Sequence, residues 1–172
     1  GVRADGFHLI DAEMVSLELH DVLTITEDES GMSVSGPFAS GVPIDDNNLV
    51  NRALQLCGKT AHVHIEKNIP HGGGLGGGSS DAAAVLRWAG YSDYVASSRL
   101  GADIPFCMLG GRARVTGIGE ILEPLAFVAR EITLVMPPFG VSTPAVYKAF
   151  DSLHAQHDGP NDLEPAAIAV EP

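Results

Sequence analysis

The feature that most constrains this chain is a glycine run at residues 72–78, where six of seven residues are glycine. Consecutive glycines cost backbone entropy, but they permit positive φ angles and let backbone amides approach an anion closely. Ser79, Ser80 and Asp81 follow directly, and an alanine-rich stretch then runs to about Ala89. Because serine and aspartate favour helix starts, we expect a helix to begin at these three residues. N–H groups and the helix dipole attract negative charge there, so the sequence predicts a phosphate-binding loop.

Three other interpretations of the glycine run are weaker. A flexible linker is the ordinary meaning of a glycine-rich stretch, but the capped helix directly after it argues against one. The glycines at 72, 74 and 77 match the GxGxxG pattern, yet residues 67–71 separate them from the preceding strand, whereas dinucleotide-binding folds place them directly after it. A Walker loop requires a lysine before serine or threonine, and no lysine follows these glycines.

Elsewhere the hydrophobic pattern predicts a mixture of strands and helices. We expect strands at residues 14–19, 22–26, 63–65, 112–115 and 132–136, the last of them buried. We expect helices from about residue 48, from 91 to 100, and from Ser142 or Thr143 to about residue 154. Residues 30–48 are polar and rich in glycine and proline, which is typical of a loop. One mixed unit is expected to end near residues 126–131, where another begins.

Charge and composition exclude some classes of function. A formal net charge of -12, from 22 acidic and 10 basic residues, repels nucleic acid and offers no basic stripe to bind it. No apolar run approaches the roughly 18 to 20 residues that a membrane helix needs. Cys57 and Cys107 lie far apart without a CxxC pair, which indicates reduced thiols and favours the cytoplasm. We therefore expect a cytoplasmic protein that binds neither nucleic acid nor a membrane. The expected partner is a small molecule, and the expected state is a monomer or homodimer.

Residues 70–84 resemble the nucleotide loop of GHMP kinases, whose pattern is Pro-x-x-x-Gly-Leu-Gly-Ser-Ser-x-Ala-Ala. The form GLGGGSSDAAA is similar to the branch of that superfamily that acts on 4-diphosphocytidyl-2-C-methyl-D-erythritol. Further segments resemble the same branch: RADGFH at residues 3–8, GADIPF at 101–106, GIGE at 117–120 and GVSTP at 140–144. They occur in the family's order over nearly the whole chain, which is far more specific than any single motif.

The resemblance implies an α+β GHMP kinase fold with two domains. Residues 1–128 correspond to the N-terminal nucleotide-binding domain, an α/β domain like domain 2 of ribosomal protein S5. Residues 129–172 correspond to the beginning of a ferredoxin-like C-terminal domain. Family members are longer, with a lysine-bearing strand before this region and a second glycine-rich motif after it. The resemblance therefore implies a first domain that lacks its first strand and a truncated second domain.

The resemblance also implies roles at the nucleotide site. Asp103 matches the catalytic aspartate, a base for the attacking hydroxyl, although an isolated aspartate before a proline turn is more often a cap or turn residue. Asn48 and Lys67 match positions that flank the nucleotide, and the alternatives are a helix-cap asparagine and a solvated lysine. The loop residues that would hold the ATP phosphates are Pro70, His71, Gly72, Gly73, Gly74, Leu75, Gly76, Gly77, Gly78, Ser79 and Ser80.

For the substrate, the resemblance implies a cytidine pocket. Phe7 and Tyr147 would stack on the two faces of the pyrimidine, while His8 would hydrogen-bond the base and Thr143 lies in a matching segment. Phe7 stands where a tyrosine is expected, but stacking does not need the hydroxyl. The alternatives are a core phenylalanine, a surface histidine and a tyrosine on a helix face.

Metal ligands have little support in the sequence. His62 and His64 share one face of a strand, but no further ligand has recognisable spacing, so we expect a solvated face. Mg²⁺ is expected to arrive with ATP instead of occupying a preformed protein site.

Together these features imply an ATP-dependent kinase. The resemblance implies that it phosphorylates the 2-hydroxyl of 4-diphosphocytidyl-2-C-methyl-D-erythritol in the non-mevalonate route to isoprenoids. Phosphoryl transfer asks the protein mainly for positioning, charge neutralisation and a base. Two alternatives stay open: another GHMP kinase of the homoserine or mevalonate type, and a nucleotide-binding fragment without turnover.

Overall fold

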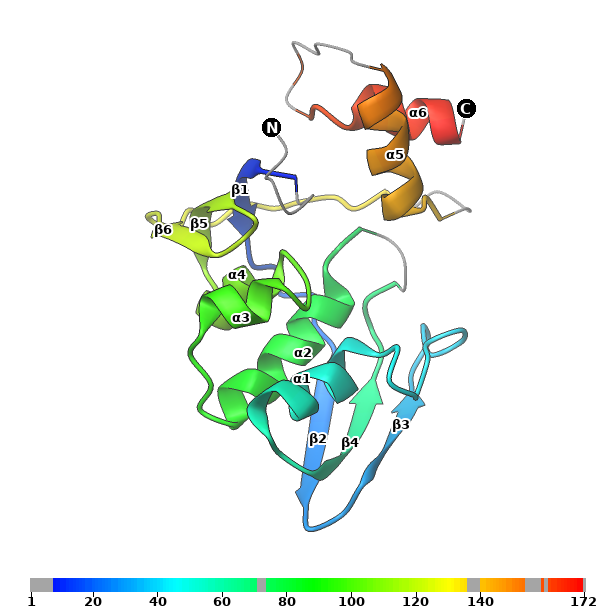
Figure 1. The fold of residues 1–172 in the computed structure, drawn as a ribbon, viewed down its shortest axis with the longest axis vertical. Helices are drawn as coiled ribbons and strands as arrows, with labels where there is room; N and C mark the ends of the chain where they lie inside the picture. Colours follow the sequence, from blue (N-terminus) through cyan, green and yellow to red (C-terminus); the bar gives the residue numbers. More distant parts are fainter. Residues whose placement is uncertain (1–7, 71–73, 136–139, 154–158, 160, 172) are drawn as a thin grey trace. The chain divides into compact units, whose positions relative to one another are not determined.

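The computed structural model describes residues 8–70, 74–135, 140–153, 159 and 161–171 (Figure 1). The strands are β1 (Ile10–Val15), β2 (Val22–Glu27), β3 (Gly31–Ser35), β4 (Ala61–Glu66), β5 (Arg112–Gly117) and β6 (Ile121–Pro124). The helices are α1 (Leu49–Cys57), α2 (Gly77–Trp88), α3 (Tyr94–Ser98), α4 (Ile104–Leu109), α5 (Thr143–Leu153) and α6 (Glu164–Val170). Among the described residues, no helix has both the length and the apolar character to cross a membrane.

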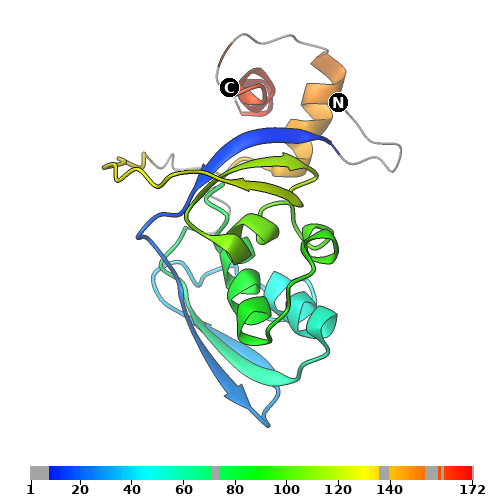
Figure 2. The same cartoon turned by 90° about the vertical axis from the view of Figure 1, so that its left-hand side faces the viewer.

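One sheet has the strand order β2-β4-β3, in which β4 is antiparallel to β2 and parallel to β3. Strand β4 alternates as its sequence predicts, with Val63 and Ile65 fully buried and the intervening histidines on the opposite face. Helices α1 and α2 cover the buried face (Figures 1 and 2). Val50 from α1 and Leu86 from α2 are fully buried in the same core. Alternation in the strand and helical spacing in the helices therefore converge on one apolar layer.

A second sheet has the order β1-β5-β6, with all pairs antiparallel. Its inner face contributes Ala113 and Val115, which pack with Phe106 from α4. Helix α4 also packs against α2, so α4 lies between α2 and this sheet (Figure 2). The residues at the start of α4 are thereby held in the same compact body as the start of α2.

The chain divides into two compact units. The first contains residues 1–71 and 76–131, and the second contains residues 72–75 and 132–172. Helices α5 and α6 pack against each other in the second unit, with Val146 and Ala166 buried. The domain boundaries implied by the family resemblance stay a prediction.

Two strand predictions were wrong. The strand expected at residues 14–19 is β1, which begins four residues earlier at Ile10 and ends at Val15. Residues 132–135 form no strand in the described structure, and Ile132 and Val135 are 52% and 87% exposed. An apolar run alone does not make a strand, because the backbone also needs a partner for its N–H and C=O groups. β3 was missed within a stretch whose glycine and serine content predicted a loop.

The helix boundaries also differ from the expectation. α2 begins at Gly77, two residues before the serines expected to start it, and its N-cap is Gly76 without a side-chain cap. The helix expected at residues 91–100 is the five-residue α3, whose N-cap Asp93 accepts from the Ala96 N–H at 2.9 Å. α1 starts after Asn48, as predicted.

Candidate active site

The glycine loop leads into α2 through a left-handed turn. Gly76 has φ 67° and ψ 18°, and Gly74 also has a positive φ of 70°. A side chain would be strained at either position, because L-residues other than glycine rarely adopt this region. The first N–H groups of α2 lack intrahelical acceptors by geometry, as at any helix start. This turn therefore presents backbone donors at the N-terminus of a 12-residue helix.

Gly77 is required by close packing at the same point. A Cβ atom at Gly77 would lie 3.0 Å from Ile69 Cγ2 and 3.4 Å from the ammonium nitrogen of Lys67. The residues before the loop therefore contact the first helical residue after it. His71, Gly72 and Gly73 lie outside the described residues, so their predicted roles stay predictions.

Asp103 lies beside this turn. A Cβ atom at Gly76 would lie 3.8 Å from Asp103 Oδ2. Asp103 precedes α4 with helical φ and ψ angles, but its side chain does not cap the helix. Burial raises the pKa of its carboxyl above the ordinary value, and no hydrogen bond to this carboxyl is found among the described residues. Asp103 thus has the cap position weighed as its alternative, but its carboxyl oxygens bond to none of the described residues.

The two serines of the motif differ in their surroundings. Ser80 Oγ donates to the Gly77 carbonyl at 2.8 Å, so this hydroxyl is used within the helix. Ser79 Oγ would lie 3.6 Å from a Cβ atom at Gly101, two residues before Asp103. The sequence pattern did not distinguish these serines, because it placed both at the start of the helix. The helix in fact begins at Gly77, so both lie within its first turn. Ser79 is the serine that faces the Asp103 segment.

The sequence left open that Lys67 is a solvated surface lysine, and the structure excludes this. Its side chain is 4% exposed, and its ammonium group donates to Asp21 Oδ2 and, at 2.8 Å, to Asp81 Oδ2. The other oxygen of Asp21 accepts from the backbone N–H groups of Asn68 at 2.5 Å and Ile69 at 2.8 Å. We call Asp21, Lys67 and Asp81 the anchor triad.

The three groups of the anchor triad respond differently to burial. Burial raises the pKa of Asp81 to about 6, because desolvation outweighs its ion pair with Lys67. Asp21 is also desolvated, but hydrogen bonds from Lys67, Ile69 and Asn68 lower its pKa. Hydrogen bonds to both carboxylates raise the pKa of Lys67 against the desolvation that lowers it. The triad thus pairs two carboxylates with one ammonium group. Of the two carboxylates, Asp81 is the one more easily protonated.

Asn48 acts as the N-cap of α1, the alternative considered for it. Its side-chain oxygen accepts from the Val50 N–H at 2.9 Å, and its side-chain nitrogen donates to the Pro43 carbonyl at 2.8 Å. A nucleotide contact of Asn48 or Lys67 stays a prediction.

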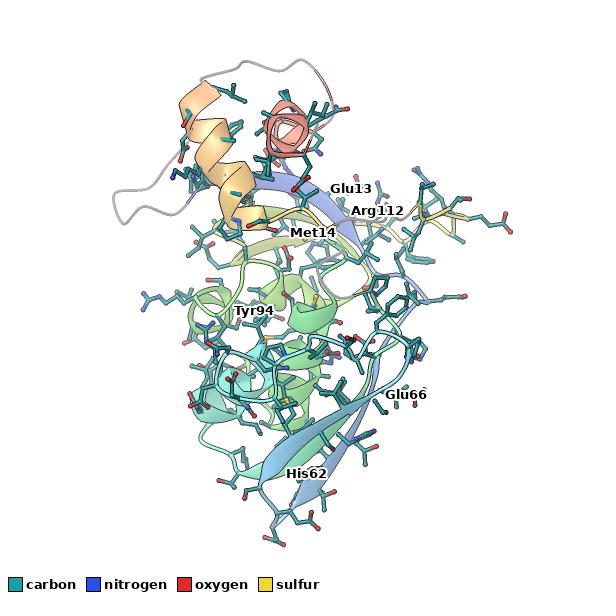
Figure 3. All side chains as sticks on the ribbon, turned by 90° about the vertical axis from the view of Figure 1, so that its right-hand side faces the viewer. Glu13, Met14, His62, Glu66, Tyr94 and Arg112 are labelled. Carbon is teal, nitrogen blue, oxygen red and sulfur yellow. The ribbon has the colours of Figure 1, made fainter. Side chains whose placement is uncertain are left out.

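The strand face with the two histidines is hydrogen-bonded to serines. Ser33 Oγ lies 2.9 Å from His64 Nδ1 and 3.3 Å from His62 Nε2, and Ser35 Oγ lies 2.9 Å from His64 Nε2. Figure 3 labels His62 and Glu66 on this sheet. No group of three or more histidine, cysteine or acidic side chains suited to a metal is found among the residues that the structure describes.

The residues predicted for the cytidine pocket belong to different parts of the chain. Phe7 lies outside them, and His8 is half-buried in an isolated β-bridge of the first unit. Thr143 and Tyr147 lie on α5 of the second unit, where Thr143 is exposed and Tyr147 is half-buried. The cytidine roles of these residues stay predictions.

Sequence reasoning missed Asp21 and gave Asp81 only a place in the first turn of α2. A signal for Asp81 was present, because it shares helical spacing with the apolar residues 82, 85 and 86, and all four are among the buried residues of α2. An aspartate on that stripe needs a buried partner. Asp21 gave no such signal, because a polar residue between two apolar stretches is typical of a turn.

The comparisons with known proteins bear on the family and the fold of the chain. The family model described as the GHMP kinases N terminal domain matches residues 48–111, which include α1, β4, the glycine loop, α2 and Asp103. A crystal structure of 4-(cytidine 5'-diphospho)-2C-methyl-D-erythritol kinase matches 98% of this chain and 72% of its own, with a TM-score of 0.66 and 32% sequence identity. The expected α+β GHMP kinase fold is thereby confirmed.

Curated relatives carry the same name. A 4-diphosphocytidyl-2-C-methyl-D-erythritol kinase of Paracoccus denitrificans is 46% identical over 96% of this chain, and the chain spans 59% of that relative's length. A kinase of this name from Cereibacter sphaeroides is 38% identical over 100% of this chain and 72% of its own length. One from Clostridium botulinum is 40% identical over 88% of this chain and 59% of its own length. The chain therefore belongs to the 4-diphosphocytidyl-2-C-methyl-D-erythritol kinase family of GHMP kinases.

Proposed function

We propose that the protein transfers the γ-phosphate of ATP to the 2-hydroxyl of 4-diphosphocytidyl-2-C-methyl-D-erythritol. The observation that carries this proposal is the position of the Asp103 carboxylate beside the left-handed turn at Gly76. A phosphate cradle and a base must lie together for phosphoryl transfer, since the hydroxyl attacks the phosphorus that the cradle holds. The relatives' names supply the acceptor, and the alternative acceptors homoserine and mevalonate have no support among them.

Each group has one task in this mechanism. The backbone N–H groups at the start of α2 bind the phosphates, and the helix dipole favours their negative charge there. Asp103 accepts the proton of the attacking hydroxyl, whose oxygen bonds to the γ-phosphorus as the bond to the ADP oxygen breaks. The pKa of Asp103, raised by burial, makes this carboxylate a stronger base than an exposed aspartate.

Mg²⁺ is proposed to enter with ATP. The Ser79 hydroxyl, which faces the Asp103 segment, would offer the ion one oxygen ligand, and phosphate and water oxygens would complete its shell. When bound, the ion neutralises phosphate charge. The cytoplasm remains the proposed location.

Asp103→Asn tests the base. The substitution keeps the size of the side chain and removes its basicity, so kcat should fall at least about 100-fold while ADP affinity stays within about twofold. Asp93→Asn is the matched control, because Asp93 only caps α3 and should leave turnover unchanged. Near-normal kcat in the Asp103 variant would remove this residue from the role.

Gly76→Val tests the phosphate cradle. A branched side chain at φ 67° should displace the turn, so ADP titrated into the variant should bind at least about tenfold more weakly. Gly58→Val is the control, because Gly58 is a left-handed glycine of similar φ, 64°, at the end of α1. Equal ADP affinity in both variants and the wild type would place the phosphates elsewhere.

Tyr147→Ala tests the proposed cytidine clamp. Stacking on an aromatic face is worth about 1 to 3 kcal/mol per base, so substrate binding should weaken while ADP binding is kept. Calorimetry with the diphosphocytidyl substrate and with CMP measures this, since a pocket that reads cytidine should bind both. If neither bound to the wild type while homoserine or mevalonate did, the acceptor would be wrong.

A further inference from the structure

The anchor triad connects three segments that are distant in sequence. Asp21 precedes β2, Lys67 follows β4, and Asp81 lies in the second turn of α2. Asp21 binds Lys67 with one carboxylate oxygen and two backbone N–H groups, those of Asn68 and Ile69, with the other. Lys67 also donates to Asp81, which lies 14 residues further along the chain. One ammonium group therefore links the segment before the glycine loop to the helix after it.

The linked segments are the two ends of the glycine loop. The upstream end is fixed at the backbone, because the Lys67 N–H donates to the Ser35 carbonyl at 2.8 Å and the Phe38 N–H donates to the Lys67 carbonyl at 3.2 Å. The downstream end contacts it at Gly77, whose Cβ position lies 3.4 Å from Lys67 Nζ. The span from Ile69 to Gly77 thus has both ends held at one point.

Stability is a poor reason for this arrangement. The side chains of Asp21, Lys67 and Asp81 are 1%, 4% and 5% exposed, so three formal charges with a net charge of -1 are taken out of water. Apolar side chains of similar volume could fill such a site without the desolvation cost. What an ion pair adds over apolar packing is direction, since each hydrogen bond has a preferred distance and angle.

We propose that Asp21, Lys67 and Asp81 are positioning residues that hold the two ends of the glycine loop at the spacing that nucleotide phosphates require. The proposal rests on the proposed function, in which this loop binds ATP. It assigns to the triad a share of the nucleotide affinity, although none of its members has to touch the nucleotide.

The decisive variant is Lys67→Met combined with Asp81→Asn. It removes the bridge between the loop ends and leaves no unpaired buried carboxylate at position 81. It also keeps the net charge of the triad at -1, carried by Asp21, so long-range electrostatics at the phosphate site change little. We expect ADP to bind about tenfold or more weakly by calorimetry, while the midpoint of urea unfolding stays near that of the wild type.

Asp11→Asn combined with Arg114→Met is the matched control. It removes a carboxylate and a cation from an ion pair on the β1-β5-β6 sheet, where the side chains are 59% and 53% exposed. This double variant should bind ADP like the wild type. Wild-type ADP affinity in a folded Lys67→Met/Asp81→Asn protein would overturn the proposal and reduce the triad to a structural feature.

If the double variant does not fold, the single variant Asp81→Asn tests whether the triad contributes to ADP affinity. The groups that act on Asp81 are Lys67 at the end of β4 and Asp21 before β2. From α4, Cys107 senses the charge of Asp81, but burial raises the pKa of its thiol to about 12, so it stays neutral. Asp103 lies beside Gly76 and is present in both proteins being compared.

The readout compares ADP affinity with stability at one pH, 7.5. Asparagine keeps the volume of the Asp81 side chain but removes the charge that binds Lys67 at the downstream end of the loop. ADP should therefore bind more weakly to the variant although the midpoint of urea unfolding does not fall. Unchanged ADP affinity in the folded variant would overturn the proposal, whereas a wild type that does not bind ADP would overturn the proposed function.

Discussion

The two sheets of the first unit use the same ion-pair chemistry with different consequences. On the β1-β5-β6 sheet, Arg114 donates to both oxygens of Asp11, at 2.8 Å and 2.7 Å, and Arg112 donates to Glu13 at 2.7 Å. Figure 3 shows Glu13 and Arg112 on these neighbouring strands. Next to the β2-β4-β3 sheet, Lys67 donates to Asp21 and Asp81 with almost no exposure to water. Both sets join residues distant in sequence.

The difference shows that burial, more than bond geometry, decides what an ion pair does. The Arg114 pair has two short hydrogen bonds, but water competes for both groups and screens their charges. The anchor triad lies where water cannot replace a lost partner, so each member depends on the other two. The exposed pairs align strands weakly, whereas the buried triad fixes the ends of the glycine loop.

Lys67→Met should give the largest effect on stability. Removing the ammonium group leaves Asp21 and Asp81 buried together without their cation, which typically costs about 3 to 5 kcal/mol. Urea unfolding at pH 7 measures this loss. Adding Asp81→Asn should recover most of it, because the repulsion between the carboxylates is then gone. A loss below about 1 kcal/mol would mean that the triad behaves like the exposed pairs.

Asp81→Asn should change how stability depends on pH. The pKa of Asp81 rises from 3.8 to about 6 on folding, so the folded state binds a proton more tightly than the unfolded state between these values. The free energy of unfolding of the wild type should therefore fall as pH rises through this window, by up to about 3 kcal/mol. Asparagine has no such titration, so the variant should gain stability relative to the wild type from pH 4 to pH 7. If the free energies of unfolding of the two proteins changed in parallel with pH, the raised pKa of Asp81 would be contradicted.

Gly77→Ala should change stability less, and the sign of the change should depend on packing against Ile69. Alanine favours a helix over glycine by about 1 kcal/mol, but its Cβ would lie 3.0 Å from Ile69 Cγ2. Overpacking of this kind costs about 1 to 3 kcal/mol, so we expect a net loss of thermal stability. Gly78→Ala is the control, because its Cβ would only reach Leu49 Cδ1 at 3.8 Å and should stabilise the helix. A higher melting temperature for Gly77→Ala than for Gly78→Ala would refute the close approach.

Arg114→Met should have the smallest effect. The exposed ion pair with Asp11 is expected to contribute about 0.2 to 1 kcal/mol, and added salt should reduce even that contribution. Urea unfolding of the variant in low and high salt tests this expectation. A loss comparable to that of Lys67→Met would erase the distinction between the two sheets.

The sequence by itself predicted the local features whose causes lie within a few residues. The glycine loop and the helix after it could be predicted from the sequence, because glycine permits left-handed backbone angles and alanine favours a helix. Asn48 as a helix cap and the alternation along β4 are equally local, since each follows from one side chain or one strand period. The family motif added Asp103, which no local pattern could have separated from an ordinary turn residue.

Tertiary structure decided the features that depend on partners elsewhere in the chain. Residues 132–135 were predicted as a strand from their apolar content, but no described strand pairs with them. α2 starts at Gly77, where a Cβ atom would lie 3.0 Å from Ile69 Cγ2, and the sequence pattern does not contain this contact. The anchor triad is the clearest case, because Lys67 and its two carboxylates are ordinary surface residue types. Only the fold removes them from water and brings Asp21, 46 residues from Lys67, into hydrogen-bond contact. Burial and long-range proximity arise from the packed chain as a whole, so no window of sequence can contain them.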